Sequence, residues 1–212
     1  GYHPTGAPED CIRHPHVDYV CRGEGEEAFE ELVRALEDGN LRGIASIQNI
    51  WSRDLDDSSK IHRNELRRLI PDLDQLPFWD RDLFDFETML ANDAKGSVYH
   101  DYFHVPAITG RGCPYQCSYC CNSELMAMYE GRGDFIRRQS ARRICDELEY
   151  CVERYKPRCI EFWDEEFDLP LAKLRELASE YRSRVATPFM IFKTAGLGRI
   201  ENLQILKEMG CV

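Results

Sequence analysis

The sequence predicts an α/β fold built on a parallel sheet. From residue 105 onward, short apolar runs alternate three times with longer amphipathic segments. The short runs have the length of buried strands, and the longer segments have the 3.6-residue apolar period of helices. Strands and helices that alternate at this length form parallel sheets with right-handed crossovers. The pattern fits a (β/α) barrel or an open, doubly wound sheet, and periodicity alone does not separate the two.

A strand and a helix are also expected near the start of the chain. Residues 17–21 form an apolar run that ends in a glycine-rich turn, which predicts a short buried strand. Residues 25–40 follow with an apolar stripe at helical spacing, and Gly39 is a suitable stop. A strand that runs through a tight turn into a helix is typical of α/β proteins.

The middle of the chain is less regular. Residues 44–51 alternate between apolar and polar side chains, as an edge hairpin does. Residues 68–87 are rich in proline, aspartate and aromatic residues without a sustained period. Their aromatic content argues against disorder, so we interpret them as an ordered linker that lies across a domain surface.

The repeated part is predicted element by element. The first strand, residues 105–109, leads into a cysteine-rich loop. Ser140 is a suitable N-cap for the helix that follows this loop. Gly210 is a suitable stop for the last helix. The remaining expected elements are a helix over 139–155, a strand over 159–163, a helix over 169–185, a strand over 188–194 and a helix over 199–210.

Composition limits the classes of partner. The chain has 212 residues, 43% of them hydrophobic, and a formal net charge of -11. So acidic a chain is a poor default partner for nucleic acid or anionic membrane, and we expect neither. No apolar run approaches the roughly 20 residues that cross a bilayer, so no transmembrane segment is expected. Because the chain starts without Met and stops where a strand would begin, we expect a fragment of a longer protein.

The cysteines indicate a reducing compartment. There are ten in 212 residues, and four of them lie within nine positions. A secreted disulfide scaffold is usually shorter and carries its cysteines throughout. We therefore predict a cytoplasmic protein with one metal-type cluster of thiols. The other six cysteines are expected to be structural, several of them in the core: Cys11, Cys21, Cys145, Cys151, Cys159 and Cys211.

The clustered cysteines have the spacing of a metal site. Cys113, Cys117 and Cys120 follow the first predicted strand at its carboxyl end, where α/β proteins build active sites. Thiolates favour zinc or iron–sulfur clusters. Structural zinc needs four ligands, but Cys121 is adjacent to Cys120 and His104 lies on the far side of the strand. A three-ligand set leaves one position open, so we favour an iron–sulfur cluster over zinc and over structural thiols.

This motif resembles a known superfamily. The spacing of Cys113, Cys117 and Cys120, with the aromatic Tyr119 before the last cysteine, looks like the radical S-adenosylmethionine superfamily. Residues 109–123 and 128–140 look like the subgroup that carries a cobalamin-binding domain ahead of the radical domain.

The resemblance extends over most of the chain. Residues 1–10 and 17–36 are similar to the end of that cobalamin-binding domain, and residues 70–86 are similar to its linker. The resemblance implies a partial (β/α) barrel, with its first half present, preceded by the C-terminal remnant of a Rossmann-like cobalamin-binding domain. It implies that residues 1–45 belong to the cobalamin-binding part, residues 46–100 to the linker and residues 101–212 to the N-terminal part of the barrel.

The resemblance also implies the roles of the loop residues. Cys113, Cys117 and Cys120 would each bind one iron of a 4Fe-4S cluster. The fourth iron would be chelated by the amino and carboxylate groups of S-adenosylmethionine, with Tyr119 near the adenine. An electron from an external donor such as flavodoxin or ferredoxin would then cleave the sulfonium and give a 5′-deoxyadenosyl radical, which abstracts hydrogen from a small-molecule substrate.

A carboxylate is expected to meet the methionine amino group. The end of the second strand, residues 163–166, occupies the place where the superfamily usually makes this contact. A carboxylate suits an ammonium group there. The Gly-Gly-Glu of many members is absent, and of Asp164, Glu165 and Glu166 we favour Glu165.

Several outcomes stay open. If cobalamin is present, it could accept a methyl group and deliver it to the substrate. Cyclisation or oxidation without methylation is equally compatible with the motif. The Asp-x-His-x-x-Gly motif of many cobalamin domains is absent, so this chain alone is expected to bind cobalamin poorly. The alternatives are a zinc-stabilised binding module without catalysis and an electron-transfer iron–sulfur protein, which would need a fourth cysteine ligand.

Overall fold

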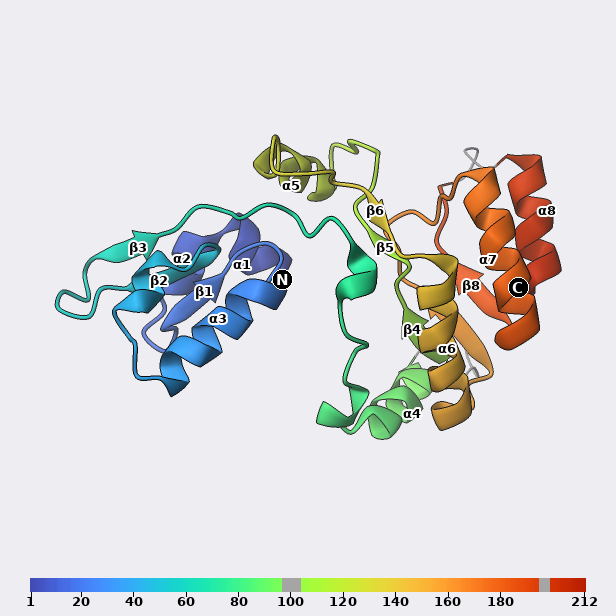
Figure 1. Ribbon diagram of the computed structural model, residues 1–212, viewed down its shortest axis with the longest axis horizontal. Coiled ribbons are helices and arrows are strands. Elements are labelled where there is room, and N and C mark those ends of the chain that lie inside the picture. The colour runs from blue at the N-terminus through green and yellow to red at the C-terminus, as the bar shows by residue number, and fades with distance from the viewer. Residues whose placement is uncertain (97–103, 195–198) are drawn as a thin grey trace. The chain divides into compact units, whose positions relative to one another are not determined.

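A computed structural model describes residues 1–96, 104–194 and 199–212 (Figure 1). These residues form two compact units, both of mixed helices and strands. The first unit contains residues 1–71 and 114–135, and the second contains residues 72–113 and 136–212. The α/β class and its parallel sheet are confirmed. The expected boundary between residues 100 and 101 lies outside the described residues, and the three predicted domain ranges stay predictions.

The first unit is built on an antiparallel sheet of order β1-β2-β3. Its strands are β1 (Tyr19–Cys21), β2 (Ile50–Arg53) and β3 (Ile61–Arg63). Its helices are α1 (Tyr2–Gly6), α2 (Pro8–Arg13), α3 (Glu26–Glu37) and α5 (Asn122–Met128). The strand and helix predicted from residues 17–40 are therefore confirmed. The hairpin expected over residues 44–51 is wrong, because residues 43–46 form the 3₁₀ turn η1 (Gly43–Ser46) and the hairpin joins β2 to β3.

Both faces of this sheet carry apolar side chains. Successive side chains of a strand point to opposite faces, so each strand contributes to both. Val20 pairs with Trp51 in the register of β1 and β2, and both pack against Ile12 of α2. Ile50, on the opposite face, packs with Ala28 of α3. One helix therefore covers each face.

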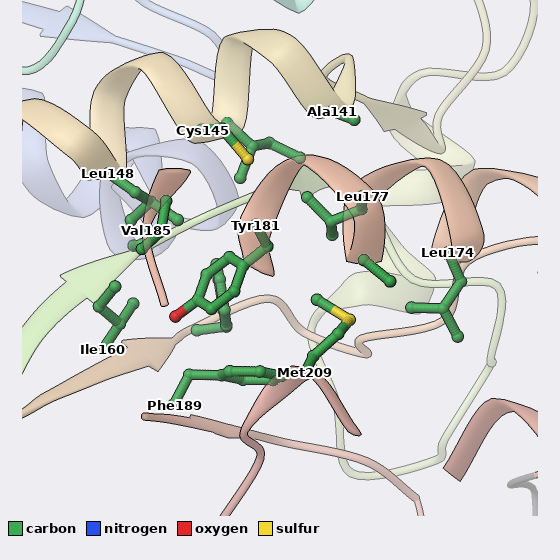
Figure 2. Packing of buried hydrophobic residues seen from close by; sticks show 14 of the residues in the cluster. Ala141, Cys145, Leu148, Ile160, Leu174, Leu177, Tyr181, Val185, Phe189 and Met209 are labelled. Atoms are coloured by element: carbon green, nitrogen blue, oxygen red, sulfur yellow. The ribbon is translucent and has the colours of Figure 1, made fainter. Parts of the chain in front are cut away.

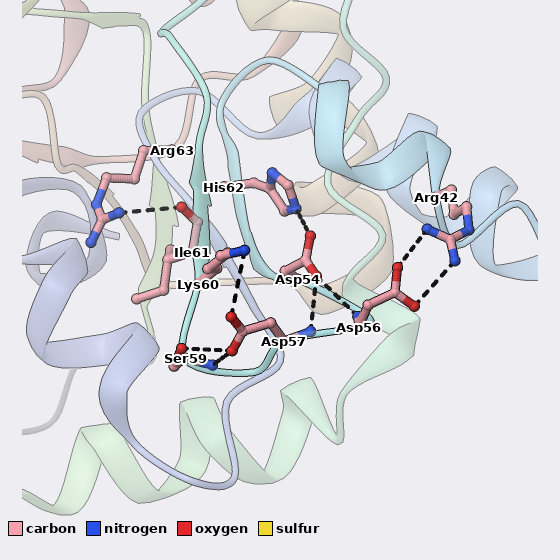
Figure 3. Close-up of polar contacts among 9 residues, drawn as sticks. All are labelled: Arg42, Asp54, Asp56, Asp57, Ser59, Lys60, Ile61, His62 and Arg63. Atoms are coloured by element: carbon pink, nitrogen blue, oxygen red, sulfur yellow. Dashed lines mark hydrogen bonds and ion pairs between the residues drawn. The ribbon is translucent and has the colours of Figure 1, made fainter.

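The turn between β2 and β3 is stabilised by its own acidic residues (Figure 3). The Asp54 carboxylate accepts hydrogen bonds from the backbone N–H groups of Asp56 and Asp57, both at 2.9 Å, and it lies 2.9 Å from the His62 ring. These contacts hold the pKa of Asp54 below its usual value, and the hydrogen bond from the Asp56 N–H has the largest effect on that pKa. Arg42 binds the Asp56 carboxylate through two nitrogens, at 3.0 and 3.2 Å. Turn formation thus explains this acidic cluster.

The second unit is built on the parallel sheet β4-β7-β8. Its strands are β4 (His104–Ala107), β7 (Cys159–Phe162) and β8 (Phe189–Ile191). A two-stranded antiparallel ribbon, β5 (Gly110–Arg111) with β6 (Arg137–Arg138), follows β4. The helices are α4 (Phe86–Gly96), α6 (Ala141–Tyr155), α7 (Leu171–Arg184) and α8 (Ile200–Met209). Each strand and helix that the sequence predicts between residues 105 and 210 is present.

Helices α6, α7 and α8 share one core with one face of this sheet (Figure 2). Ile160 and Phe162 of β7 point into it, and Phe189 of β8 stacks edge-on against Tyr181 of α7. The Tyr181 hydroxyl, which is buried, donates a hydrogen bond of 2.6 Å to the Thr187 carbonyl. Because side chains alternate, Glu161 lies on the other face of β7.

The predicted helix ends are confirmed. The Ser140 hydroxyl accepts a hydrogen bond of 3.1 Å from the Arg143 backbone N–H, as an N-cap does. Gly210 ends α8 in the left-handed conformation, with φ of 107°.

Residues 72–86 are ordered along α6. Short 3₁₀ turns occur at η2 (Leu73–Gln75) and η3 (Arg81–Leu83). The Arg81 guanidinium lies 2.9 Å from the Glu147 carboxylate of α6, and Arg143 of α6 donates to the Leu76 carbonyl at 3.0 Å. This part of the predicted linker therefore packs on the second unit.

The scattered cysteines agree with a structural role. All ten cysteines lie in the described part of the chain, and none of them forms a disulfide there. Cys145, Cys151 and Cys159 are buried, and burial raises the pKa of their thiols to about 12, 11 and 11. Such thiols are protonated at neutral pH and inert. Among the residues that the structure describes, no helix has the length and apolar character needed to cross a membrane.

Truncating the centre of the second core should destabilise the protein. Leu177 of α7 is 1% exposed, so Leu177→Ala is expected to lower the free energy of unfolding by about 2–5 kcal/mol. Leu203→Ala is the matched control, because Leu203 lies on α8 with 47% of its surface exposed, and it should change stability by less than about 0.5 kcal/mol. Urea denaturation followed by circular dichroism measures both, and equal losses would contradict this core assignment.

Candidate functional site

The carboxyl ends of the three parallel strands meet at one edge of the second unit. Ala107, Phe162 and Ile191 are in register across β4, β7 and β8. The loops that leave these strands therefore start side by side. In parallel α/β architectures this edge is where ligands bind. Among the described residues, the polar side chains near these strand ends include Thr109, Asp164, Glu165, Glu166, Asp168, Lys193 and Thr194.

Asp164 ties the end of β7 to the end of β4. Its carboxylate accepts hydrogen bonds from the Thr109 backbone N–H at 3.0 Å and from the Thr109 hydroxyl at 2.7 Å. The Arg138 guanidinium lies 3.8 Å away. Burial raises the pKa of Asp164 above its usual value, although the Thr109 bonds act in the opposite direction. Asp164 therefore has a structural contact within the protein.

Glu166 ties the end of β7 to the end of β8. Its carboxylate lies 3.0 Å from the Lys193 ammonium and accepts hydrogen bonds from the Thr194 backbone N–H at 2.9 Å and the Thr194 hydroxyl at 2.5 Å. Burial alone would raise the pKa of Glu166, but the bonds from Thr194 and Lys193 outweigh it and hold the pKa below its usual value. Lys193 also lies 3.3 Å from Asp168.

Glu165 differs from its two neighbours. Asp164 and Glu166 are buried in contacts between strand ends, whereas the Glu165 side chain is exposed. The sequence did not separate these three carboxylates, because their roles depend on which side of the loop each one faces. Of these three carboxylates, Glu165 is therefore the one that reaches solvent. Its role as the contact for an ammonium group stays a prediction.

The cysteine loop is divided between the two units. Cys113 is buried in the second unit, while Cys117 and Cys120 are half-buried in the first. A tight turn joins the latter pair, since the Cys120 backbone N–H donates to the Cys117 carbonyl at 3.0 Å. Tyr119, at the tip of this turn, is 91% exposed, and a hydrogen bond with the Cys117 thiol raises its pKa. Cys121 is exposed.

No metal site is formed by side chains within residues 1–96, 104–194 and 199–212. There, no group of three His, Cys, Asp or Glu side chains is arranged to hold a metal ion. The metal-binding role of Cys113, Cys117 and Cys120 therefore stays a prediction. In chemical terms the donor set fits, because thiolates are the usual ligands of iron–sulfur clusters and three of them leave one iron open for another ligand.

Asn122 is a further candidate for the site, and the sequence analysis missed it. It begins α5 (Asn122–Met128), two positions after Cys120, and only 5% of its surface is exposed. Its side-chain oxygen is buried and has no hydrogen-bond partner among the described residues. Buried polar atoms are normally satisfied, so an unsatisfied acceptor beside the cysteines fits a loop that holds a polar group. The sequence signal was its closeness to the cysteines, but its burial was not predictable from a seven-residue helix.

No protein-family model matches the chain. It is 32% identical over 80% of its length to an uncharacterized methyltransferase of Pyrococcus horikoshii, of which it covers 33%. It is 24% identical over 99% of its length to the cytidylyl-2-hydroxyethylphosphonate methyltransferase of Streptomyces wedmorensis, of which it covers 42%. It is 28% identical over 62% of its length to the anaerobic magnesium-protoporphyrin IX monomethyl ester cyclase of Synechocystis, of which it covers 24%.

These relatives are enzymes. Methyltransferases and a cyclase are two of the outcomes that the radical S-adenosylmethionine resemblance left open, and their similarity supports that resemblance. The chain spans between about a quarter and two fifths of the length of these relatives.

The Glu166 contacts should make stability depend on pH in a defined direction. The pKa of Glu166 is held below its usual value in the folded protein. The ionised carboxylate therefore contributes fully to the free energy of unfolding above the unfolded-state pKa of about 4.3. This contribution is lost as the pH falls through the lower folded-state pKa. Glu166→Gln is expected to be less stable than the wild type by about 1–3 kcal/mol at pH 7. This difference should shrink below about pH 4.3. Urea denaturation between pH 7 and pH 3 measures it, and a constant difference would contradict this account.

Proposed function

We propose that this chain is part of a radical S-adenosylmethionine enzyme. The observation that carries the proposal is the position of the cysteine motif, which follows the first strand of a parallel sheet at its carboxyl end. The similarity to methyltransferases and cyclases supports it. A zinc-stabilised binding module accounts less well for three closely spaced thiols and enzyme relatives.

The proposed fold of residues 101–212 is the first half of a (β/α) barrel. Consecutive crossover helices α6, α7 and α8 all pack on one face of the sheet β4-β7-β8. A barrel keeps its helices on one face, whereas a doubly wound sheet carries them on both. Residues 1–45 are proposed as the C-terminal remnant of a Rossmann-like cobalamin-binding domain, on the resemblance of residues 1–10 and 17–36.

Each site residue has a proposed task. Cys113, Cys117 and Cys120 would hold the 4Fe-4S cluster, which when bound supplies the electron that cleaves S-adenosylmethionine. The exposed Glu165 carboxylate would bind the ammonium group of the methionine moiety, because charge-assisted hydrogen bonds are strong. The exposed Tyr119 would lie against the adenine.

The buried carboxylates and Asn122 have supporting tasks. Asp164 and Glu166 hold the loops of the three strand ends in place through Thr109, Thr194 and Lys193. Asn122 would direct its unsatisfied side-chain oxygen to a donor of the bound cofactor. The protein's part in the reaction is therefore to bind, orient and exclude water, while the cofactors carry the difficult step.

The wider proposal covers substrate and partners. We propose a small-molecule substrate, a cytoplasmic location and an external electron donor such as flavodoxin or ferredoxin. Two methyltransferases among the relatives favour methylation, with cobalamin as the methyl carrier of the whole protein. Cyclisation is the alternative reaction, and the similarity to the magnesium-protoporphyrin cyclases supports it.

Reconstitution with iron and sulfide under anaerobic conditions should give a brown protein. We expect about four irons and four acid-labile sulfides per chain. Cys113→Ser, Cys117→Ser and Cys120→Ser should each lose most of the cluster. Cys121→Ser is the matched control and should retain it, because the neighbouring Cys121 is not a proposed ligand. One zinc without acid-labile sulfide would refute the proposal in favour of the binding module.

Removing the Glu165 charge should weaken binding of S-adenosylmethionine. For Glu165→Gln in the reconstituted protein, we expect the dissociation constant to rise about tenfold, since a hydrogen bond to a charged group contributes about 1.5–3 kcal/mol. Glu153→Gln, on the exposed surface of α6, is the control and should leave binding unchanged. Isothermal titration calorimetry measures both. Equal affinities in the two variants would exclude Glu165 as the ammonium ligand.

A further inference from the structure

The segment that follows the cysteines is anchored on the N-terminal part of the chain. Tyr129 packs with Leu66 and Leu69, and Met128 and Phe135 pack against the same cluster. These residues belong to one compact unit, although about sixty residues separate the two sequence regions. The contact therefore joins the end of α5 to a distant segment that carries none of the candidate site residues.

Tyr129 makes a polar contact that is specific in geometry. Its side chain is 5% exposed, and its hydroxyl accepts a hydrogen bond of 3.0 Å from the Glu24 backbone N–H. The preceding residue is Gly23, whose φ is 70°. A Cβ atom at Gly23 would lie 1.7 Å from the Tyr129 hydroxyl oxygen. Gly23 thus provides both the left-handed turn and the space that the tyrosine occupies.

Arg132 provides a second anchor. Its guanidinium donates to the Leu66 carbonyl and, at 2.7 Å, to the Glu65 carboxylate. Its backbone carbonyl accepts a hydrogen bond of 2.8 Å from the Leu69 N–H. Side chain and backbone of Arg132 are therefore both bound to residues 65–69.

The surface that receives these anchors is itself fixed by Asn49. This residue is fully buried and has a φ of 70°. Its side-chain amide donates to the Glu24 carbonyl at 2.7 Å, and its side-chain oxygen accepts from the Arg67 N–H at 2.7 Å. Asn49 thereby ties the turn that binds Tyr129 to the segment that binds Arg132. We call residues 23–24, 49 and 65–69 the docking platform.

Helix α5 connects the docking platform to the cysteines. The Leu125 N–H donates to the Cys121 carbonyl at 3.0 Å, and the Tyr129 N–H donates to the Leu125 carbonyl at 3.1 Å. At a rise of about 1.5 Å per residue, this continuous helical turn structure places Tyr129 about 12 Å from Cys121. These hydrogen bonds tie the backbone at Tyr129 to the backbone at Cys121, the residue that follows Cys120. The position of Tyr129 is therefore coupled to the turn of Cys117 and Cys120 through hydrogen-bonded backbone.

We infer that the docking platform positions the cysteine turn, with Tyr129 as the positioning residue. This inference rests on the proposed function, in which Cys117 and Cys120 hold the cluster. Misplacement of a reacting group by about 1 Å can cost about a hundredfold in rate, so a fixed turn has a direct use. The N-terminal segment then contributes to the reaction without touching the reacting atoms.

The first test measures thiol reactivity in the protein without a cluster. Tyr129→Phe keeps the apolar ring but loses the hydroxyl, so the cysteine turn should become more mobile. Alkylation of Cys117 and Cys120 by iodoacetamide is followed by mass spectrometry. Its rate is expected to rise about threefold to tenfold, because the loss of one hydrogen bond shifts a local opening equilibrium by about that factor. The rate at Cys11 should not change. Tyr150→Phe, on the exposed surface of α6, is the control.

The second test uses the reconstituted protein. Tyr129→Phe should retain about four irons, yet its KM for S-adenosylmethionine in reductive cleavage should rise about threefold to tenfold. Its electron paramagnetic resonance signal on addition of S-adenosylmethionine should also differ from that of the wild type. A merely structural tyrosine would lower the melting temperature without these changes.

A pair of glycine variants checks the same contact from the other side. Gly23→Ala should reproduce the alkylation pattern of Tyr129→Phe, because the new methyl group displaces the tyrosine. Gly39→Ala is matched in backbone strain, with φ of 68°. Apart from its two chain neighbours, no described residue has an atom within 4 Å of the added carbon, so this variant should leave the alkylation rates unchanged.

The outcomes separate this inference from the proposed function. If the wild-type protein assembles a cluster but Tyr129→Phe and Gly23→Ala leave both alkylation and KM unchanged, the docking platform has no positioning role. If the wild-type protein assembles no cluster, the proposed function fails, and the alkylation rates still decide whether the platform holds the turn. Accelerated alkylation in both Gly23→Ala and Gly39→Ala would also overturn the inference, since strain alone would then explain it.

Discussion

Two buried carboxylates hold the edge of the second unit on which the candidate site depends. Asp164 binds Thr109 after β4, and Glu166 binds Lys193 and Thr194 after β8, so the loop after β7 is fastened on both sides. A buried charge is costly unless it is paired and hydrogen-bonded, which favours one arrangement of these three loops over others. The adjacent Glu165 is presented outward as a result.

The first unit applies a similar constraint with neutral groups. Its buried Asn49 joins segments by hydrogen bonds of its side chain, and Tyr129 adds the segment that follows the cysteines. In both units, side chains outside the proposed ligand set fasten the segments that carry the proposed ligands. Substitutions at the cysteines alone would not reveal these supporting contacts.

Much of the fold was predictable from the sequence because it depends on local periodicity. The helical stripes and the caps at Ser140 and Gly210 specify α6 and α8 almost to the residue. The pairing of β2 with β3 was not predictable, because strand pairing depends on the turn over residues 54–60, whose carboxylates bond to its own backbone. The candidate site divides in the same way. The cysteine spacing is local, whereas the separate roles of Asp164 and Glu166 depend on partners that are distant in sequence.

The discontinuous first unit has a consequence for biosynthesis. Residues 1–71 leave the ribosome well before residues 114–135, which complete that unit. Synthesis proceeds at about 5–20 residues per second, so Tyr129 is made several seconds after Leu66 and Leu69, the residues it packs against. Until then these two leucines lack the tyrosine they pack against, so the first unit can be completed only after residues 114–135 have been synthesised.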